Sequence, residues 1–290
     1  MQKGKPKKII HPSKKQRKPG LEDKMTVQPP KFDTSVTDPG KKLRGKVALI
    51  TGGDSGIGRA VAVAFAKHGA DVAICYLKYE TKDAELTQEY VEAYGQQCLL
   101  LPGNISNEKH CNHVVEKTIE KFKKLDILIN NAAIHYPKDK IEDISSEQLI
   151  ETFSINVYPM FYLVKAAMKH LKAGSSIINT GSVTAYRGSG HLIDYSATKG
   201  AIISFTRSLA AALVDKKIRV NAVSPGPVWT PLIVSSMKPK DIATFGSDSP
   251  MGRAGDPAEI APCYLFLASD ESSFITGQVL HPNGGEIVNG

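Results

Sequence analysis

The sequence has few of the features that mark membrane, secreted or metal-binding proteins. No apolar run approaches the roughly 18 residues that a membrane-spanning helix needs. The basic amino-terminal region has one apolar pair, Ile9 and Ile10, and so lacks the apolar segment of a secretory signal. The cysteines are scattered, without CxxC or metal-ligand spacing, which indicates buried thiols in a reducing compartment. We therefore expect a cytoplasmic protein without a metal site or a membrane span.

An excess of positive charge is also missing from most of the chain and is confined to its start. Residues 1–44 hold 13 Lys and Arg against 4 Asp and Glu, whereas the remaining 246 residues hold 24 against 25. The first 44 residues hold 6 of the 17 prolines and too few apolar side chains to offset the entropy cost of ordering them. We predict a basic, proline-rich, partly disordered extension over residues 1–44 and one domain over residues 45–290. Within the extension, residues 1–24 are expected to be disordered, and residues 25–42 to lie extended on a folded surface with Phe32 as an anchor.

A basic extension can bind nucleic acid or an acidic membrane surface. No aromatic residue is interleaved with its lysines, and no nucleic-acid-binding motif follows. We therefore favour a solubilising or packing extension and do not expect nucleic acid as a partner, while binding of another polyanion stays an alternative.

Beyond the extension, short apolar runs alternate with segments of helical periodicity, and no repeat of 20–50 residues indicates a solenoid. The predicted strands are residues 47–51, 71–76, 97–101, 126–130, 176–181, 219–223 and 278–280. The predicted helices are residues 57–68, 82–94, 108–122, 146–171, 195–214 and 257–269. Continuous apolar strands between helices are typical of a parallel sheet that is covered on both faces. The pattern predicts a single-domain α/β fold of the Rossmann type, a doubly wound parallel seven-stranded sheet with ligands bound beyond the carboxyl ends of the strands.

A glycine-rich stretch, Thr51-Gly52-Gly53-Asp54-Ser55-Gly56-Ile57-Gly58, follows the first predicted strand and opens the first predicted helix. In this position Gly52 permits a tight turn, Gly56 lets a pyrophosphate approach the backbone, and Gly58 lets helix and strand lie close together. The N–H groups of the helix start then receive the phosphates. A structural turn is the alternative, but the strand before it and the helix after it favour a nucleotide site.

Ser182, Tyr195 and Lys199 are separated by thirteen and four residues. Tyr195 and Lys199 are one turn apart on a predicted helix, so they share a face. An ammonium group and an oxidised nicotinamide ring both lower the pKa of a neighbouring phenol, which lets it exchange a proton with an alcohol or carbonyl. Ser182, beyond a strand end, can hydrogen-bond the substrate oxygen. A packed tyrosine beside an exposed lysine is the alternative for YxxxK alone, and the glycine stretch argues against it.

These motifs together resemble the short-chain dehydrogenase/reductase family, in the branch with the TGxxxGIG spacing. The resemblance runs from about residue 42 to the end and also includes Asn130-Asn131-Ala132-Ala133, Asn156, Pro225-Gly226 and Thr230. The long extension, the GGDSGIG loop and the closing NGGEIVNG resemble a bacterial, stress-associated subgroup. The resemblance implies that Asn156 supports a water chain that relays protons through Lys199, and that residues 277–290 take part in a homotetramer contact.

The resemblance also implies which residues bind the dinucleotide: Gly52, Asp54, Ser55, Gly56, Ile57, Gly58, Tyr76, Asn104, Ile105, Asn131, Ala132, Ala133, Tyr195, Lys199, Pro225, Gly226, Val228 and Thr230. Tyr76 stands where an aspartate is usual in the family, and Asn104 replaces another aspartate. A negative Asp54 near the adenosine ribose argues against an added 2′-phosphate, while Lys78 argues weakly for one. We therefore expect NAD(H), with NADP(H) as the alternative.

We predict an NAD(P)-dependent oxidoreductase that interconverts a small-molecule alcohol and a carbonyl, with polyols or small carbonyls favoured as substrates. Residues 225–253 have the composition of a mobile lid over the substrate, with a plain surface loop as the alternative. His135, His191 and Trp229 either line the substrate pocket or have surface and packing roles. Another possible function is a catalytically silent nucleotide-binding scaffold or sensor with a polyanion-binding tail.

Overall fold

A computed structural model describes residues 12–17, 20–27 and 41–288. Its sheet is seven-stranded and parallel throughout, in the order β3-β2-β1-β4-β5-β6-β7. The strands are β1 (Val47–Thr51), β2 (Asp71–Tyr76), β3 (Cys98–Pro102), β4 (Ile127–Asn130), β5 (Ser176–Thr180), β6 (Arg219–Val223) and β7 (Val279–Leu280). Strand order reverses between β1 and β4, and a cleft opens beyond the carboxyl ends at such a reversal. The predicted doubly wound fold is confirmed.

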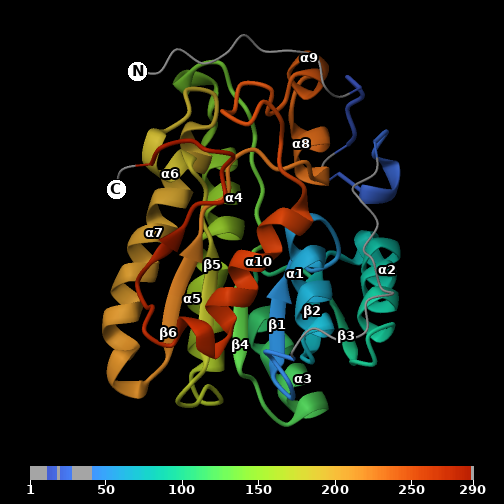
Figure 1. Cartoon of the computed structure of the whole chain (residues 1–290). Coiled ribbons are helices and arrows are strands. Elements are labelled where there is room, and N and C mark those ends of the chain that lie inside the picture. Colours follow the sequence, from blue (N-terminus) through green and yellow to red (C-terminus); the bar gives the residue numbers. More distant parts are fainter. Residues whose placement is uncertain (1–11, 18–19, 28–40, 289–290) are drawn as a thin grey trace.

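Helices cover both faces of the sheet (Figure 1). One apolar core lies between the sheet and α1, α2 and α10, and a second lies between the sheet and α3, α5 and α7. The helices are α1 (Gly56–Lys67), α2 (Thr81–Glu92), α3 (Glu108–Phe122), α4 (Ser146–Asn156), α5 (Tyr158–Ala167), α6 (Thr184–Arg187), α7 (Ile193–Leu213), α8 (Pro231–Ser236), α9 (Pro239–Ala243) and α10 (Pro257–Ala268). Because both faces are covered, the central strands β1, β4 and β5 bury every side chain, whereas the edge strands β3 and β7 are partly exposed.

The turn from β1 into α1 brings helix and strand into close contact. Gly52 and Gly56 have positive φ angles of 61° and 52°, which side chains other than glycine rarely adopt. At Gly58 a Cβ atom would lie 1.8 Å from the carbonyl oxygen of Gly52. The glycines are therefore required for the backbone of this turn, and they leave the start of α1 bare toward the carboxyl edge of the sheet.

The single helix predicted over residues 146–171 is wrong, because the structure divides it into α4 and α5. The break is at Val157, whose φ and ψ are −119° and −54°. Pro159 follows at the start of α5, where its missing N–H costs no hydrogen bond. The chain returns to helix directly after Val157, and so short an interruption does not show in a search for helical periodicity.

The expectation that residues 1–24 are disordered is wrong for residues 20–24, which lie against the domain, and for Gln16, whose N–H donates to the carbonyl oxygen of Val234 on α8. Residues Glu22–Lys24 form a 3₁₀ turn, and Glu22 is only 3% exposed. The following Met25 is 4% exposed, and it packs with Trp229 in a small apolar cluster beneath α8 and α9. Phe32, the expected anchor, lies outside the described residues.

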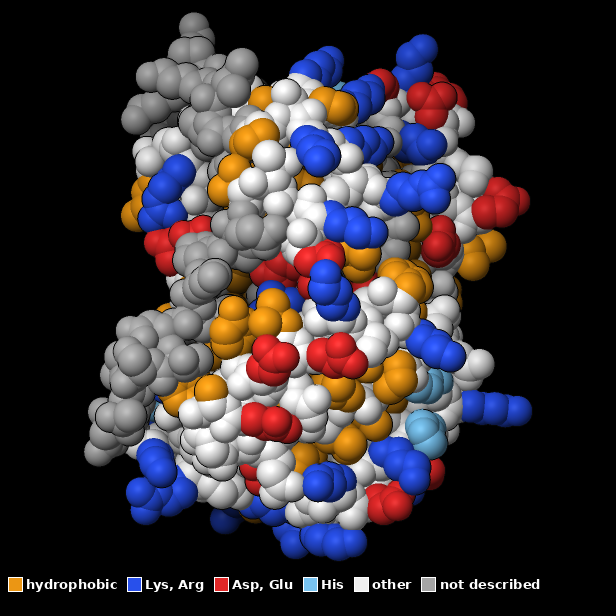
Figure 2. All heavy atoms as spheres, turned by 90° about the vertical axis from the view of Figure 1, so that its right-hand side faces the viewer, with side chains coloured by type: hydrophobic (Ala, Val, Ile, Leu, Met, Phe, Trp, Pro, Cys, Tyr) orange, Lys and Arg blue, Asp and Glu red, His pale blue; other side chains and the backbone are white. Residues whose placement is uncertain are grey.

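The surface carries charges of both signs. Figure 2 looks onto the side that carries α2, and it shows acidic and basic side chains interspersed there. None of the helices in the described part of the chain has the length and apolarity that crossing a membrane requires. Over the same residues, no group of three or more His, Cys, Asp or Glu side chains is arranged to hold a metal ion.

The contact between α1 and β1 gives a first prediction. Gly58→Ala should lower the free energy of unfolding by about 2 kcal/mol or more, because its methyl group meets backbone that cannot move aside. Chemical denaturation monitored by circular dichroism measures this change. Gly200→Ala is the matched control: Gly200 lies inside α7 with open space around it, so this variant should gain up to about 1 kcal/mol. Equal stability of the two variants would contradict the close contact.

Candidate active site

A cavity of about 1810 Å³ opens at the carboxyl edge of the sheet. It runs from the glycine stretch, residues 51–58 (hereafter the glycine loop), past the ends of β4 and β5 to α8 and α9. The predicted site residues that line it are Gly52, Asp54, Ser55, Gly56, Ile57, Tyr76, Asn104, Ile105, Asn131, Ala132, Ala133, Ser182, Tyr195, Lys199, Pro225, Gly226, Val228 and Thr230. Gly58 and Asn156 are not among the lining residues and lie behind the wall.

The Asn131 side chain joins the glycine loop to two neighbouring strands. Its amide nitrogen donates to the carbonyl oxygens of Thr51 and Gly52, at 3.1 and 3.2 Å. Its amide oxygen accepts from the Thr180 hydroxyl at 3.2 Å. The Thr51 hydroxyl in turn accepts from the backbone N–H groups of Asn131 and Ala132. These bonds set the distance between the glycine loop and the end of β5.

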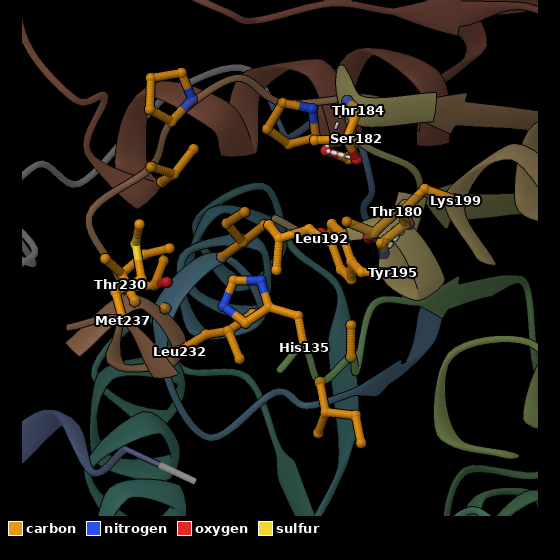
Figure 3. A pocket seen from close by; sticks show the side chains of 18 of the residues that line it. His135, Thr180, Ser182, Thr184, Leu192, Tyr195, Lys199, Thr230, Leu232 and Met237 are labelled. Atoms are coloured by element: carbon orange, nitrogen blue, oxygen red, sulfur yellow. Dashed lines mark hydrogen bonds between the residues drawn. The ribbon is translucent and has the colours of Figure 1, made fainter. Parts of the chain in front are cut away.

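Tyr195 and Lys199 lie together at that strand end, as their spacing on α7 predicts (Figure 3). The Lys199 ammonium nitrogen is 5.3 Å from the centre of the Tyr195 ring and donates to the Thr180 carbonyl oxygen at 2.8 Å. Ser182 lies close enough to Tyr195 to lower its pKa, and the Ser182 hydroxyl oxygen accepts from the Thr184 hydroxyl at 3.0 Å. The three side chains therefore converge on one point of the cavity wall.

Burial dominates the acid–base properties of this group. It raises the pKa of Tyr195 to about 12, and the neighbouring Ser182 hydroxyl only partly opposes that rise. It lowers the pKa of Lys199 to about 7, because a desolvated ammonium is unfavourable. With the protein's own groups alone, Tyr195 therefore keeps its proton at neutral pH.

Asn156 uses its whole side-chain amide to support the backbone. Its oxygen accepts from the Ile134 N–H at 2.9 Å, and its nitrogen donates to the Ile134 carbonyl and to the Thr198 hydroxyl. Thr198 donates to the carbonyl oxygen of Tyr195 at 2.6 Å. Asn156 thus ties the segment after β4 to the helical turn that carries Tyr195, and its place in a proton relay stays a prediction.

Asp194 is a site residue that the sequence reasoning missed. This buried carboxylate accepts from the Gln148 amide and the Thr152 hydroxyl of α4, both at 2.9 Å, and from the Tyr195 N–H. An acidic residue in the first turn of a helix, directly before the tyrosine of YxxxK, was the available signal. It fastens the start of α7 to α4.

The pocket residues proposed from their position have different roles. His135 lines the cavity, with its ring centre 5.2 Å from that of Tyr195, and its Nε2 is in contact with the Ser236 hydroxyl on α8. His191 also lines it but is exposed and lies 3.6 Å from the Asp139 carboxylate. Trp229 is buried in the apolar cluster with Met25, so its role is packing.

The opposite end of the cavity, beyond β2, carries two carboxyl groups. Asp54 lies in the glycine loop, and Glu80 hydrogen-bonds the Leu77 N–H just after the strand. Burial raises the pKa of Asp54 to about 6; burial and repulsion by Asp54 raise that of Glu80 to about 8. Tyr76 stands beside them at the end of β2. Glu80 was not predicted, because it lies four residues past the strand in a 3₁₀ turn.

A family model described as enoyl-(acyl carrier protein) reductase matches residues 52–286 of the chain. That range contains the glycine loop from Gly52 onward and all three converging side chains. The chain belongs to the short-chain dehydrogenase/reductase family. It is therefore an oxidoreductase that interconverts an alcohol and a carbonyl with a nicotinamide dinucleotide.

Two relatives show how far this family likeness extends. The chain is 56% identical over 272 residues to General stress protein 39 of Bacillus subtilis, covering 94% of each chain. It is 50% identical over 282 residues to the chloroplastic NADPH-dependent aldehyde reductase 1 of Arabidopsis thaliana, covering 95% of this chain and 98% of the relative.

Solved structures of the family have the same fold. A short-chain dehydrogenase from Burkholderia cenocepacia, in complex with NADP, matches with a TM-score of 0.77 and 31% identity over 84% of this chain and 98% of that one. A 3-ketoacyl-(acyl-carrier-protein) reductase from Brucella melitensis, complexed with NADH, matches with a TM-score of 0.75 and 35% identity over the same shares. The likeness supports a nicotinamide dinucleotide as cofactor.

The anchoring of α7 gives a second prediction. Asp194→Ala should lower the free energy of unfolding by about 2 kcal/mol, because it removes the hydrogen bonds that the Gln148 amide and the Thr152 hydroxyl make to a buried carboxylate. Thermal or denaturant unfolding measures the loss. Glu147→Gln, which changes an exposed acidic residue in the first turn of α4, serves as the control and should shift the unfolding midpoint much less. A wild-type midpoint for the Asp194 variant would rule out the anchoring role.

Proposed function

We propose that Tyr195 is the acid/base of this oxidoreductase and that Ser182 orients the substrate oxygen. The observation that carries the proposal is the convergence of both hydroxyls with Lys199 on one wall of the cavity. The Ser182 hydroxyl hydrogen-bonds the substrate oxygen, an interaction that strengthens as negative charge develops there. Tyr195 transfers the proton at its phenol oxygen, and Lys199 stabilises the phenolate form.

The residues of the glycine loop fit a nicotinamide dinucleotide. Gly56 and the start of α1 present bare backbone to the cavity, and a Cβ at Gly56 would lie 3.2 Å from the methyl carbon of Thr230. Such a narrow, glycine-lined helix start suits a pyrophosphate. When bound, the dinucleotide supplies or accepts the hydride. Lys199 would also hydrogen-bond its nicotinamide ribose, and Thr230 its amide.

The pKa values favour one direction of reaction. A tyrosine that keeps its proton at neutral pH is ready to donate it to a developing alkoxide, as carbonyl reduction requires. In alcohol oxidation Tyr195 must first lose that proton, and a positive charge near the ring would favour this loss. We infer that the protein's own groups prepare the site for carbonyl reduction.

We infer that the cofactor is NAD(H) rather than NADP(H). Asp54 and Glu80 lie at the cavity end beyond β2, where the family places the adenosine ribose. Carboxyl groups accept hydrogen bonds from ribose hydroxyls and repel a 2′-phosphate. NADP(H) is the alternative, and the name of the Arabidopsis thaliana relative favours it.

For the substrate we propose small carbonyl compounds and polyols. The names of two relatives, an aldehyde reductase and a glucose and ribitol dehydrogenase, support this class. His135 and the Ser236 side of α8 offer polar groups beside Tyr195, which suits a substrate with several hydroxyl groups. Residues 225–253, with α8 and α9, would act as the lid over it.

We further propose that the enzyme is a cytoplasmic homotetramer in which residues 45–290 form the catalytic domain and residues 1–44 the extension. Phe274 and Ile287, toward the end of the chain, are 103% and 74% exposed, as expected of apolar side chains that another copy covers. A catalytically silent scaffold is disfavoured, because Ser182, Tyr195 and Lys199 are all present and converge.

The acid/base role gives a third prediction. Tyr195→Phe should lower turnover by about 10²–10⁴-fold, because the proton donor is lost, while dinucleotide binding stays within about twofold of wild type. Absorbance at the reduced nicotinamide band measures turnover, and titration measures binding. Tyr186→Phe is the control: this tyrosine lies on the neighbouring α6, outside the cavity wall, and its loss should leave turnover unchanged. Near-normal turnover by the Tyr195 variant would refute the role.

The acidic adenosine end gives a fourth prediction. Asp54→Ser should tighten NADP(H) binding by about tenfold and leave NAD(H) binding less affected, because it removes a carboxylate near the 2′ position. In the wild type, the pKa values of about 6 and 8 mean that negative charge grows as pH rises through this range. NADP(H) affinity should therefore fall relative to NAD(H) from pH 6 to pH 8. Tighter wild-type binding of NADP(H) than of NAD(H) at pH 8 would contradict the assignment.

A further inference from the structure

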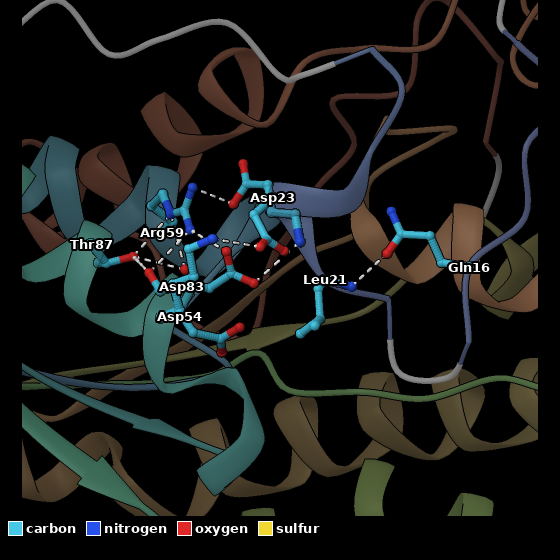
Figure 4. A network of polar contacts seen from close by, with 9 residues as sticks. Gln16, Leu21, Asp23, Asp54, Arg59, Asp83 and Thr87 are labelled. Carbon is cyan, nitrogen blue, oxygen red and sulfur yellow. Dashed lines mark hydrogen bonds and ion pairs between the residues drawn. The ribbon is translucent and has the colours of Figure 1, made fainter.

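Residues 20–27, here called the clamp, contact two parts of the molecule that border the cavity. One end lies against α8, which follows Thr230, and the middle lies against α1 and α2 near the glycine loop (Figure 4). Gly20 itself lines the cavity. The clamp therefore crosses the mouth of the dinucleotide site rather than a remote surface.

The contact with α8 is close and partly apolar. A Cβ atom at Gly20 would lie 2.1 Å from the carbonyl oxygen of Pro231, so only glycine fits there. At the other end of the clamp, the Trp229 indole N–H donates to the Val27 carbonyl oxygen at 3.2 Å. Between them the Met25 side chain is buried in the cluster under α8 and α9. Just before the clamp, the Gln16 N–H donates to the carbonyl oxygen of Val234 at 2.6 Å.

The contact with the glycine loop is made by a buried charge. The Glu22 carboxylate pairs with the guanidinium of Arg59 in the first turns of α1, and both side chains are 4% exposed. Burial raises the pKa of Glu22 to about 7, and the charge of Arg59 partly opposes that rise. The Glu22 backbone N–H donates to the Asp83 carboxylate at 3.2 Å. Detaching Glu22 would leave the buried guanidinium of Arg59 without this counter-charge, which is costly.

Arg59 connects Glu22 to the glycine loop. Its Nε donates to the carbonyl oxygen of Asp54 and to the Thr87 hydroxyl, both at 2.9 Å, and another guanidinium nitrogen donates to the Asp83 carbonyl at 3.1 Å. Each nitrogen of the guanidinium therefore has a partner, and one of those partners is loop backbone. Glu22 thus reaches the loop through Arg59, which holds the carbonyl oxygen of Asp54.

We propose that the clamp completes the dinucleotide site and that Glu22 is a positioning residue, which holds residues 54–56 in the conformation that receives the pyrophosphate. The proposal rests on the dinucleotide site proposed above. Because coupling between two binding events is reciprocal, a clamp that strengthens dinucleotide binding is itself seated more firmly by the dinucleotide. A merely structural role would lower stability without this reciprocity.

The first test separates cofactor affinity from chemistry in the full-length chain. Glu22→Ala should raise the Kd and KM for NAD(H) by about tenfold and leave kcat at saturating NAD(H) within about twofold, since Glu22 does not touch the reacting atoms. Glu22→Gln, which keeps an oxygen acceptor for Arg59, should recover part of the affinity. Lys82→Ala is the matched control, because it removes only the exposed ion pair with Asp23 of the same turn. This control should bind NAD(H) as the wild type does.

The second test uses the other end of the clamp and keeps the proposal testable if Glu22→Ala does not fold. Gly20→Ala should unseat the clamp from α8 and raise the Kd for NAD(H) in the same way. In the wild type, saturating NAD(H) should slow tryptic cleavage after the exposed Lys24. Because the coupling is reciprocal, the factor of slowing should be about equal to the factor by which Glu22→Ala raises the Kd for NAD(H).

The outcomes distinguish the clamp from the site on which it depends. The proposed role of the clamp alone would be overturned by either of two results in a wild-type chain that binds NAD(H). In one, the variants bind NAD(H) as tightly as the wild type; in the other, NAD(H) does not slow tryptic cleavage. A wild-type chain that binds neither NAD(H) nor NADP(H) would overturn the proposed function and the clamp with it.

Discussion

The side chain of Asn131 is the interaction on which the geometry of the site depends. One amide group bonds the backbone of the glycine loop on one side and the hydroxyl of Thr180 on the other. The carbonyl of Thr180 then accepts from Lys199. The glycine loop and Lys199 are therefore connected through two hydrogen-bonded residues, although they lie almost 150 positions apart in the sequence. Because both the oxygen and the nitrogen of the Asn131 amide have partners, these bonds restrict how far the loop and the end of β5 can move apart.

Around this connection, polar groups lie at an edge of the sheet where burial makes their charged forms unfavourable. The carboxyl ends of parallel strands leave carbonyl groups without partners from the sheet, and Lys199 satisfies one of them. Desolvation then raises the pKa of Tyr195 and lowers that of Lys199, so both groups are less charged than they would be in water. The same effect acts on Asp54 and Glu80 at the other end of the cavity. The protonation states of such groups change readily when a charged ligand binds beside them.

Much of the architecture was predictable from local patterns. The seven strands appear as apolar runs, and TGxxxGIG and YxxxK specify the turn after β1 and one face of α7. The division of residues 146–171 was not predictable from periodicity, because helix resumes directly after Val157 and only the backbone at that residue changes. Trp229 shows the same limit: its neighbours in space include Met25, some 200 residues away. The low apolar content of the first 24 residues likewise did not indicate that Glu22 pairs with the buried Arg59.

The clamp affects the order in which parts of the chain fold during synthesis. Its residues are synthesised well before Trp229, yet the carbonyl of Val27 pairs with that indole 202 positions later. Contacts of such long range form late, because a large loop must close before they stabilise anything. The clamp is therefore among the last segments to reach its place, and until then the buried guanidinium of Arg59 lacks the carboxylate of Glu22. A nascent chain halted before Trp229 would already hold the glycine loop but not the partner that fastens the end of the clamp.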